Sequence, residues 1–76
     1  MNAPGEGRRL ATLWNLSWNG DRLSCVVYRT QTGMLLRVES PGAVMITERF
    51  ELQPKMLARA QALRDALKRR GWQEAP

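Results

Sequence analysis

Hydrophobic and polar residues alternate between positions 10 and 30, which is typical of β-strands that bury one face. In the first such segment one face holds large apolar side chains, namely Leu10, Trp14, Leu16 and Trp18. The Asn19-Gly20 pair that follows predicts a hairpin, because both central positions of a type I′ turn need a positive φ. A two-residue turn pairs Trp18 with Asp21, Leu16 with Leu23, Trp14 with Cys25 and Thr12 with Val27. Turn chemistry and hydrophobic pattern thus predict the same register.

Two more turn signals divide the following residues into strands. Thr32-Gly33 predicts a second strand at about residues 22–30 and a third at about 34–39. A loop at these two residues pairs Val27 with Val38 and Arg29 with Leu36. Ser40-Pro41-Gly42 precedes a fourth strand, at about residues 43–50, whose one side carries Val44, Ile46 and Phe50. The register of that strand depends on the length of the loop at Pro41, which the pattern leaves open.

The pattern then changes to the spacing of a helix. Pro54 suits the first turn, where its missing N–H costs nothing. Apolar residues recur at spacings of four, three and four, at Met56, Ala60, Leu63 and Leu67. Gly71 is expected just past the end of the helix, with Trp72 against Leu67 in a Schellman ending.

These elements predict an α+β fold, a four-stranded antiparallel β-meander followed by one C-terminal helix (ββββα). Residues 10–72 form the single domain that 76 residues allow. Residues 1–9 contain Pro4 and two glycines without periodicity and are expected to be a disordered tail. Residues 73–76 are expected to fray.

One helix covers one side of such a sheet, and the pattern assigns apolar residues to the other side as well. The uncovered face is expected to carry Leu13, Val26, Tyr28, Leu35 and Met45, together with Arg37. An apolar patch of this kind is unusual on a monomer. A second copy of the chain is its simplest partner, because a self-complementary patch gives a closed two-fold dimer. The alternative is that these are scattered surface apolar residues without a role.

Composition argues against catalysis. The chain has no histidine and a single cysteine, Cys25, so neither a Cys/His metal framework nor a histidine-activated nucleophile can be built. Cys25 is interpreted as a small buried hydrophobic residue. No Gly-rich phosphate-binding motif is present, and the sequence implies no metal and no cofactor. We therefore expect a protein that binds and does not catalyse.

The net charge of +5 points to an anionic partner as the alternative. Most of the excess lies in residues 52–76, where six basic and two acidic side chains give +4. Basic surfaces with aromatic or Arg stacking groups bind single-stranded DNA or RNA. The candidate contacts are Arg22, Tyr28, Arg37, Lys55, Arg59, Lys68 and Arg69. The competing interpretation is a solvated helix face whose cations suit the end of the helix dipole.

No apolar run is long enough to span a membrane, and the N-terminus lacks the apolar stretch of a signal peptide. A cytoplasmic location is therefore expected, and an unpaired cysteine fits a reducing compartment.

Residues 23–33 read L-x-C-x-x-Y-R-T-x-x-G, from Leu23 through Cys25 and Tyr28 to Gly33. This segment resembles a recurring stretch in short uncharacterised bacterial proteins, which implies no activity. The order of four strands and a helix is also similar to the single-strand-binding folds of PC-type transcriptional coactivators and Whirly proteins. That similarity is topological only, and fold analogy does not establish function.

The leading interpretation is a small homodimeric protein that binds a protein partner without catalytic activity. The alternative is a weakly sequence-specific nucleic-acid-binding protein that uses the basic helix. Salt separates the two, because added counterions weaken phosphate binding and leave an apolar interface intact.

Overall fold

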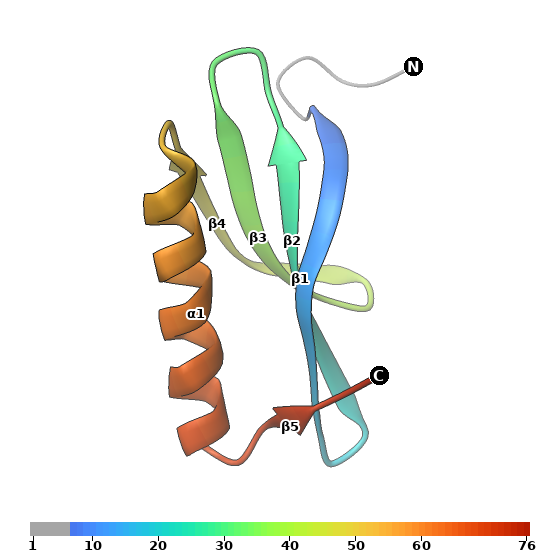
Figure 1. The fold of residues 1–76 in the computed structure, drawn as a ribbon. Coiled ribbons are helices and arrows are strands. Elements are labelled where there is room, and N and C mark those ends of the chain that lie inside the picture. Colours follow the sequence, from blue (N-terminus) through green and yellow to red (C-terminus); the bar gives the residue numbers. More distant parts are fainter. Residues whose placement is uncertain (1–6) are drawn as a thin grey trace.

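The computed structural model describes residues 7–76 and confirms the α+β meander (Figure 1). Within these residues the elements are β1 (Arg8–Trp18), β2 (Asp21–Arg29), β3 (Met34–Ser40), β4 (Ala43–Phe50), α1 (Gln53–Arg69) and β5 (Gln73–Glu74). The strands form one antiparallel sheet in the order β4-β3-β2-β1-β5. No helix of this described part is long and apolar enough to cross a membrane.

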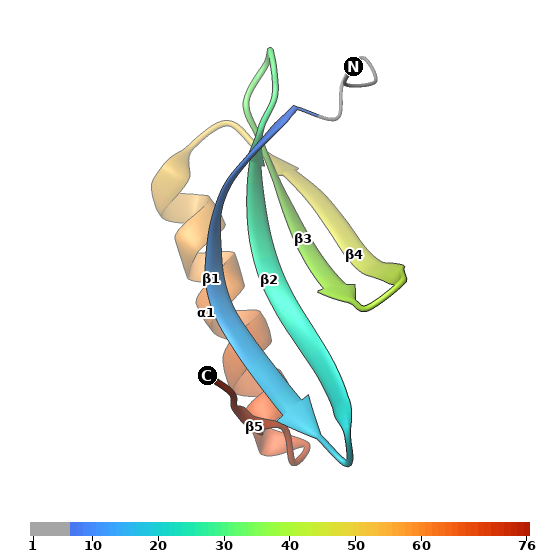
Figure 2. The same ribbon diagram turned by 90° about the vertical axis from the view of Figure 1, so that its right-hand side faces the viewer.

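The helix lies against one face of the sheet and leaves the other uncovered. Figure 2 looks onto the uncovered face, with α1 behind the strands. The core lies between sheet and helix and consists of Trp14, Leu16, Leu23, Cys25, Val27, Leu36, Val38, Met56 and Ala60. One buried hydrogen bond joins the two layers, because the Trp14 indole Nε1–H donates to the carbonyl oxygen of Ala60 at 2.9 Å.

The first hairpin follows the predicted register for most of its length. Asn19 and Gly20 both have positive φ, at 50° and 84°, as a type I′ turn requires. Three predicted pairs are present: Trp18 with Asp21, Leu16 with Leu23 and Trp14 with Cys25. Beyond them the prediction is wrong, because a register shift leaves Leu13 as an extra residue and pairs Thr12 with Val26. A bulge of this kind inserts one residue and moves the residues beyond it to the opposite face. A second register shift, between Arg9 and Ala11, then restores the original phase.

The second connection is longer than predicted. Thr30 to Gly33 form a four-residue loop, closed by the Thr30 N–H donating to the Gly33 carbonyl at 2.8 Å. The resulting pairs are Arg29 with Met34, Val27 with Leu36 and Cys25 with Val38. Each β3 residue is therefore two positions away from the predicted pairing. A shift of two residues keeps the same side chains on the buried face, because the side-chain period of a strand is two.

The fourth strand has the predicted bounds and an irregularity of its own. Ile46 pairs with Val38 and Phe50 pairs with Met34, on the helix side of the sheet. A register shift then leaves Met45 as an extra residue and places Val44 opposite Glu39. Val44 was predicted on the same side as Ile46 and is instead 52% exposed.

Both ends of the domain differ from expectation. β1 begins at Arg8, so the predicted tail does not extend to residue 9, and residues 1–6 lie outside the described residues. The C-terminal residues form β5 instead of fraying, with Glu74 opposite Leu16 and Gln73 opposite Ser17. The Ala75 N–H continues this pairing by donating to the Asn15 carbonyl at 2.9 Å.

The helix ends as the sequence predicts. The N–H groups of Gly71 and Trp72 donate to the carbonyls of Lys68 and Leu67, both at 3.1 Å, which is the Schellman pattern. Gly71 has φ = 118°, a value that favours glycine. Trp72 packs against the core and edge-on against Trp18, with 5.8 Å between ring centroids.

We expect Trp14→Phe to lower the free energy of unfolding by about 1–3 kcal/mol, because it removes the hydrogen bond to Ala60 and leaves a small cavity. Trp18→Phe is the matched control, since Trp18 is 46% exposed, and should cost less than about 1 kcal/mol. Urea unfolding followed by circular dichroism measures both. Equal losses in the two variants would show that Trp14 does not tie the helix to the sheet.

Candidate nucleic-acid interface

The uncovered face of the sheet, hereafter the open face, is polar and basic. The strand pairing arranges its side chains in rows that cross β1 to β4. The first row is Arg9, Tyr28, Leu35 and Arg49. The second is Thr12, Val26, Arg37 and Thr47, and the third is Asn15, Ser24, Glu39 and Val44. Arg22 lies opposite Ser17, one step further along the first hairpin.

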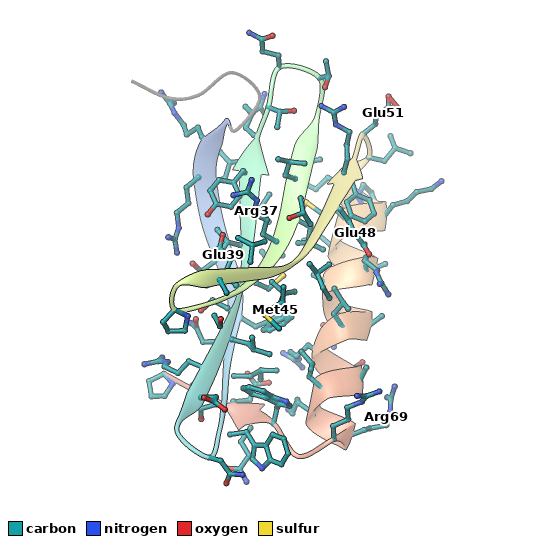
Figure 3. All side chains as sticks on the ribbon, turned by 180° about the vertical axis from the view of Figure 1, so that it is seen from behind. Arg37, Glu39, Met45, Glu48, Glu51 and Arg69 are labelled. Carbon is teal, nitrogen blue, oxygen red and sulfur yellow. The ribbon has the colours of Figure 1, made fainter. Side chains whose placement is uncertain are left out.

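Tyr28 lies in the first row of the open face and contacts two of its neighbours. Its hydroxyl donates to Glu39 Oε2 at 2.7 Å. The Arg37 guanidinium lies over its ring, 5.0 Å from the centroid, in a cation–π arrangement. Figure 3 shows Arg37 and Glu39 on the side of the sheet away from α1, whereas Glu48 points toward the helix. These contacts fix Arg37 as a flat group over the middle of the sheet.

The Tyr28–Glu39 contact changes the pKa of the Tyr28 phenol. The hydrogen bond to Glu39 raises the pKa of Tyr28, and partial burial and the negative charge of Glu39 add to this rise. The nearby positive charges of Arg9 and Arg37 oppose it. At neutral pH the hydroxyl therefore stays protonated and keeps donating to the carboxylate.

A shallow depression lies beside this network. It encloses about 250 Å³ and is lined by Arg9, Arg22, Ser24, Glu39, Ser40 and Pro41. Two arginines thus reach the same hollow from different strands. The Arg22 guanidinium also donates to the Pro76 carbonyl at 3.1 Å, which connects this face to the C-terminal residues.

Positive charge on the open face is not balanced by acidic groups. Four arginines lie on it, Arg9, Arg22, Arg37 and Arg49. Among the residues that the structure describes, none of the four has an Asp or Glu oxygen within 4.0 Å. Glu39 is the carboxylate within the three rows, and it accepts from Tyr28. The buried Nε of Arg37 has no hydrogen-bond partner among the described residues.

The predicted dimer face does not form an apolar patch. Leu13 packs against the helix-side core, and Val26 is 0% exposed although no helix covers it. Tyr28 and Leu35 are half-buried. Met45 is 62% exposed, at the bulge in β4. The bulge at Leu13 and the polar side chains around Val26 are the physical reasons for the difference.

The predicted nucleic-acid contacts fall on two separate surfaces. Arg22, Tyr28 and Arg37 lie on the open face. The others, Lys55, Arg59, Lys68 and Arg69, lie on α1, behind the sheet.

Two of these four predicted helix contacts are paired with carboxylates. Arg59 donates two hydrogen bonds to Glu48, at 2.9 and 3.0 Å, and these lower the pKa of the Glu48 carboxyl. Lys68 Nζ lies 3.0 Å from Glu74 of β5. The basic C-terminal third is therefore partly neutralised at the surface of the helix.

Sequence reasoning missed Arg9 and Arg49. The absence of periodicity assigns Arg9 to the tail, and the two register shifts in β1 bring it opposite Tyr28. Arg49 could have been placed opposite Leu35 only if the register of β4 were known. Alternation of Thr47 and Arg49 with Ile46 and Glu48 was the available signal.

Cys25 has no part in this surface. It is a free thiol, fully buried in the core, and desolvation raises its pKa to about 11. An activated cysteine has a lowered pKa, so Cys25 is not of that kind. Within residues 7–76 no group of three His, Cys, Asp or Glu side chains is placed to hold a metal ion.

Comparison with protein-family models, with curated proteins and with solved structures gave no match. The resemblance of residues 23–33 to other short proteins therefore stays a prediction.

Tyr28 is the single tyrosine of the chain, so the absorbance of its phenolate can be followed directly. We expect Tyr28 to ionise above the ordinary pKa of tyrosine and Glu39→Gln to lower that pKa. The physical reason is that a neutral amide accepts a weaker hydrogen bond from the phenol than the carboxylate does, and it no longer repels the phenolate. Glu48→Gln, on the other side of the sheet, should leave the titration unchanged. Identical titrations of wild type and Glu39→Gln would contradict the contact.

Proposed function

We propose that this protein binds single-stranded nucleic acid through the open face of its sheet and has no catalytic role. The observation that carries the proposal is that four arginines share the open face with Tyr28, without a balancing set of carboxylates among the described residues. Single strands are held by surfaces that combine positive charge with flat stacking groups. The open face has both.

The rows suggest how a strand would lie. Arg9 and Arg49 are at opposite ends of the row that contains Tyr28, three strand spacings or about 14 Å apart. A nucleic-acid backbone crossing the strands meets a guanidinium on each side of the sheet. Bases in between face the Arg37 guanidinium, which the Tyr28 ring holds in place. Guanidinium planes are common stacking partners for unpaired bases.

The shape of the face favours a single strand over a duplex. Duplex DNA is read mainly by a helix or a two-stranded ribbon that enters the major groove. Here α1 packs its buried side on the sheet, and its Arg59 and Lys68 are engaged with Glu48 and Glu74. This moves the proposed contacts from the helix to the sheet.

A protein partner is the second candidate. The observation that favours it is the exposure of Val44 and Met45, 52% and 62%, beside the outer edge of β4. Val44 ends the third row of the open face, and Met45 is the extra residue of the bulge beside it. We also propose a cytoplasmic setting, which the free thiol of Cys25 supports.

The test compares two double variants that each remove two positive charges. Arg9→Ala with Arg49→Ala should weaken binding of a single-stranded oligonucleotide more than about tenfold at 50 mM salt. Two lost phosphate contacts should also reduce the slope of log affinity against log salt by about 1.4. Arg59→Ala with Lys68→Ala is the charge-matched control and should change the slope little. Fluorescence anisotropy at several salt concentrations measures both.

Two outcomes contradict the proposal. If the helix variant loses as much affinity as the sheet variant, the attraction is general and the open face is not the binding surface. If the wild-type protein does not bind at about 50 mM salt, where phosphate contacts are strong, the nucleic-acid function is wrong.

A further inference from the structure

β4 is the outermost strand of the sheet, and nothing described covers its outer edge. Figure 2 shows β4 at the side of the sheet with no element beyond it. The opposite edge is different, because β5 pairs with part of β1. An uncovered edge strand presents unpaired N–H and C=O groups that can pair with another strand.

The alternation of antiparallel pairing shows which β4 residues present these groups. A two-residue turn makes Trp18 and Asp21 a hydrogen-bonded pair, and such pairs alternate with non-bonded ones. Carried across β2 and β3, this alternation directs the backbone groups of Thr47 and Arg49 outward. The same alternation directs Asn15 outward at the other edge, where its carbonyl does accept from Ala75.

The charges of β4 disfavour two of the ways in which two copies can pair. An antiparallel pair centred on Glu48 or on Arg49 places like charges directly opposite each other, which is unfavourable. Centred on Thr47, it places Glu48 opposite Ile46 and Arg49 opposite Met45 of the second copy. The aliphatic stem of Arg49 can then cover the exposed Met45 side chain.

We propose that two copies of this chain pair through β4, antiparallel and centred on Thr47, to form one continuous sheet. The two-fold axis of an antiparallel pair is perpendicular to the sheet. Both helices therefore lie on one side of the dimer, and both open faces lie on the other. The second copy occupies the β4 edge and not the sheet face. This pairing does not depend on nucleic-acid binding, although it doubles the length of the basic surface.

The first experiment measures the molar mass in solution by light scattering over about 1–100 µM protein, since dimerisation follows mass action. We expect twice the mass of one chain at the upper concentrations. Thr47→Pro should give a monomer, because proline removes the outward N–H. Proline is tolerated at an edge position whose N–H faces solvent, so the variant should keep its circular dichroism spectrum.

Cysteine cross-linking tests the register. In the proposed dimer the two Thr47 residues face each other with Cα atoms about 5.5 Å apart, so oxidised Thr47→Cys should form a covalent dimer. The matched control is Arg49→Cys, whose two copies would be about 13 Å apart and should not cross-link. The native Cys25 is fully buried and does not compete.

A monomer at every concentration overturns the proposal. So does a dimer that survives Thr47→Pro, or one that cross-links equally well through Arg49→Cys. The nucleic-acid function is judged separately. A wild-type dimer that binds no oligonucleotide would support pairing through β4 and contradict the nucleic-acid function.

Discussion

One helix has to bury one whole face of a twisted sheet, and the rest of the molecule is arranged around that contact. Trp14 is its centre, since it fills the space between the layers and donates to a carbonyl of α1. The remaining core side chains come from alternate strand residues and from Met56 and Ala60 of α1. Because a single helix covers only one side, the other face has to be stable in water by means of its own side chains. Val26 is an example on this face, because neighbouring side chains bury it fully without a covering helix.

The distribution of charge along the chain differs from its distribution on the surface. Residues 52–76 hold most of the net positive charge, yet Arg59 and Lys68 of α1 are paired with Glu48 and Glu74. Residues 7–51 have little net charge in sequence, but their strands direct four arginines to the same side. Strand pairing therefore concentrates charge that the sequence spreads out. This is why the proposed binding surface lies on the sheet and not on the helix.

Most of the architecture follows from local signals in the sequence. The parts that do not follow from such signals share one cause. Asn19-Gly20 specifies its hairpin, and Gly71-Trp72 specifies the end of α1, because each is a short-range backbone requirement. The bulges at Leu13 and Met45 depend on packing between strands and have no local signature. Each bulge changes which residues face outward, so the composition of the open face could be predicted only in part. Tyr28 and Arg37 were placed correctly on this face, whereas Arg9 and Arg49 required the observed register.

The pairing of β5 with β1 brings together residues from opposite ends of the described chain, Glu74 beside Leu16. Its consequence concerns the order of folding. During synthesis the meander and the helix emerge first. The part of β1 at Leu16 and Ser17 remains an unpaired edge until residue 74 has left the ribosome. Contacts of such long sequence separation slow folding, because the chain must close a large loop before they form. β5 thus makes completion of the sheet a late event, and a nascent chain exposes an extra edge until then.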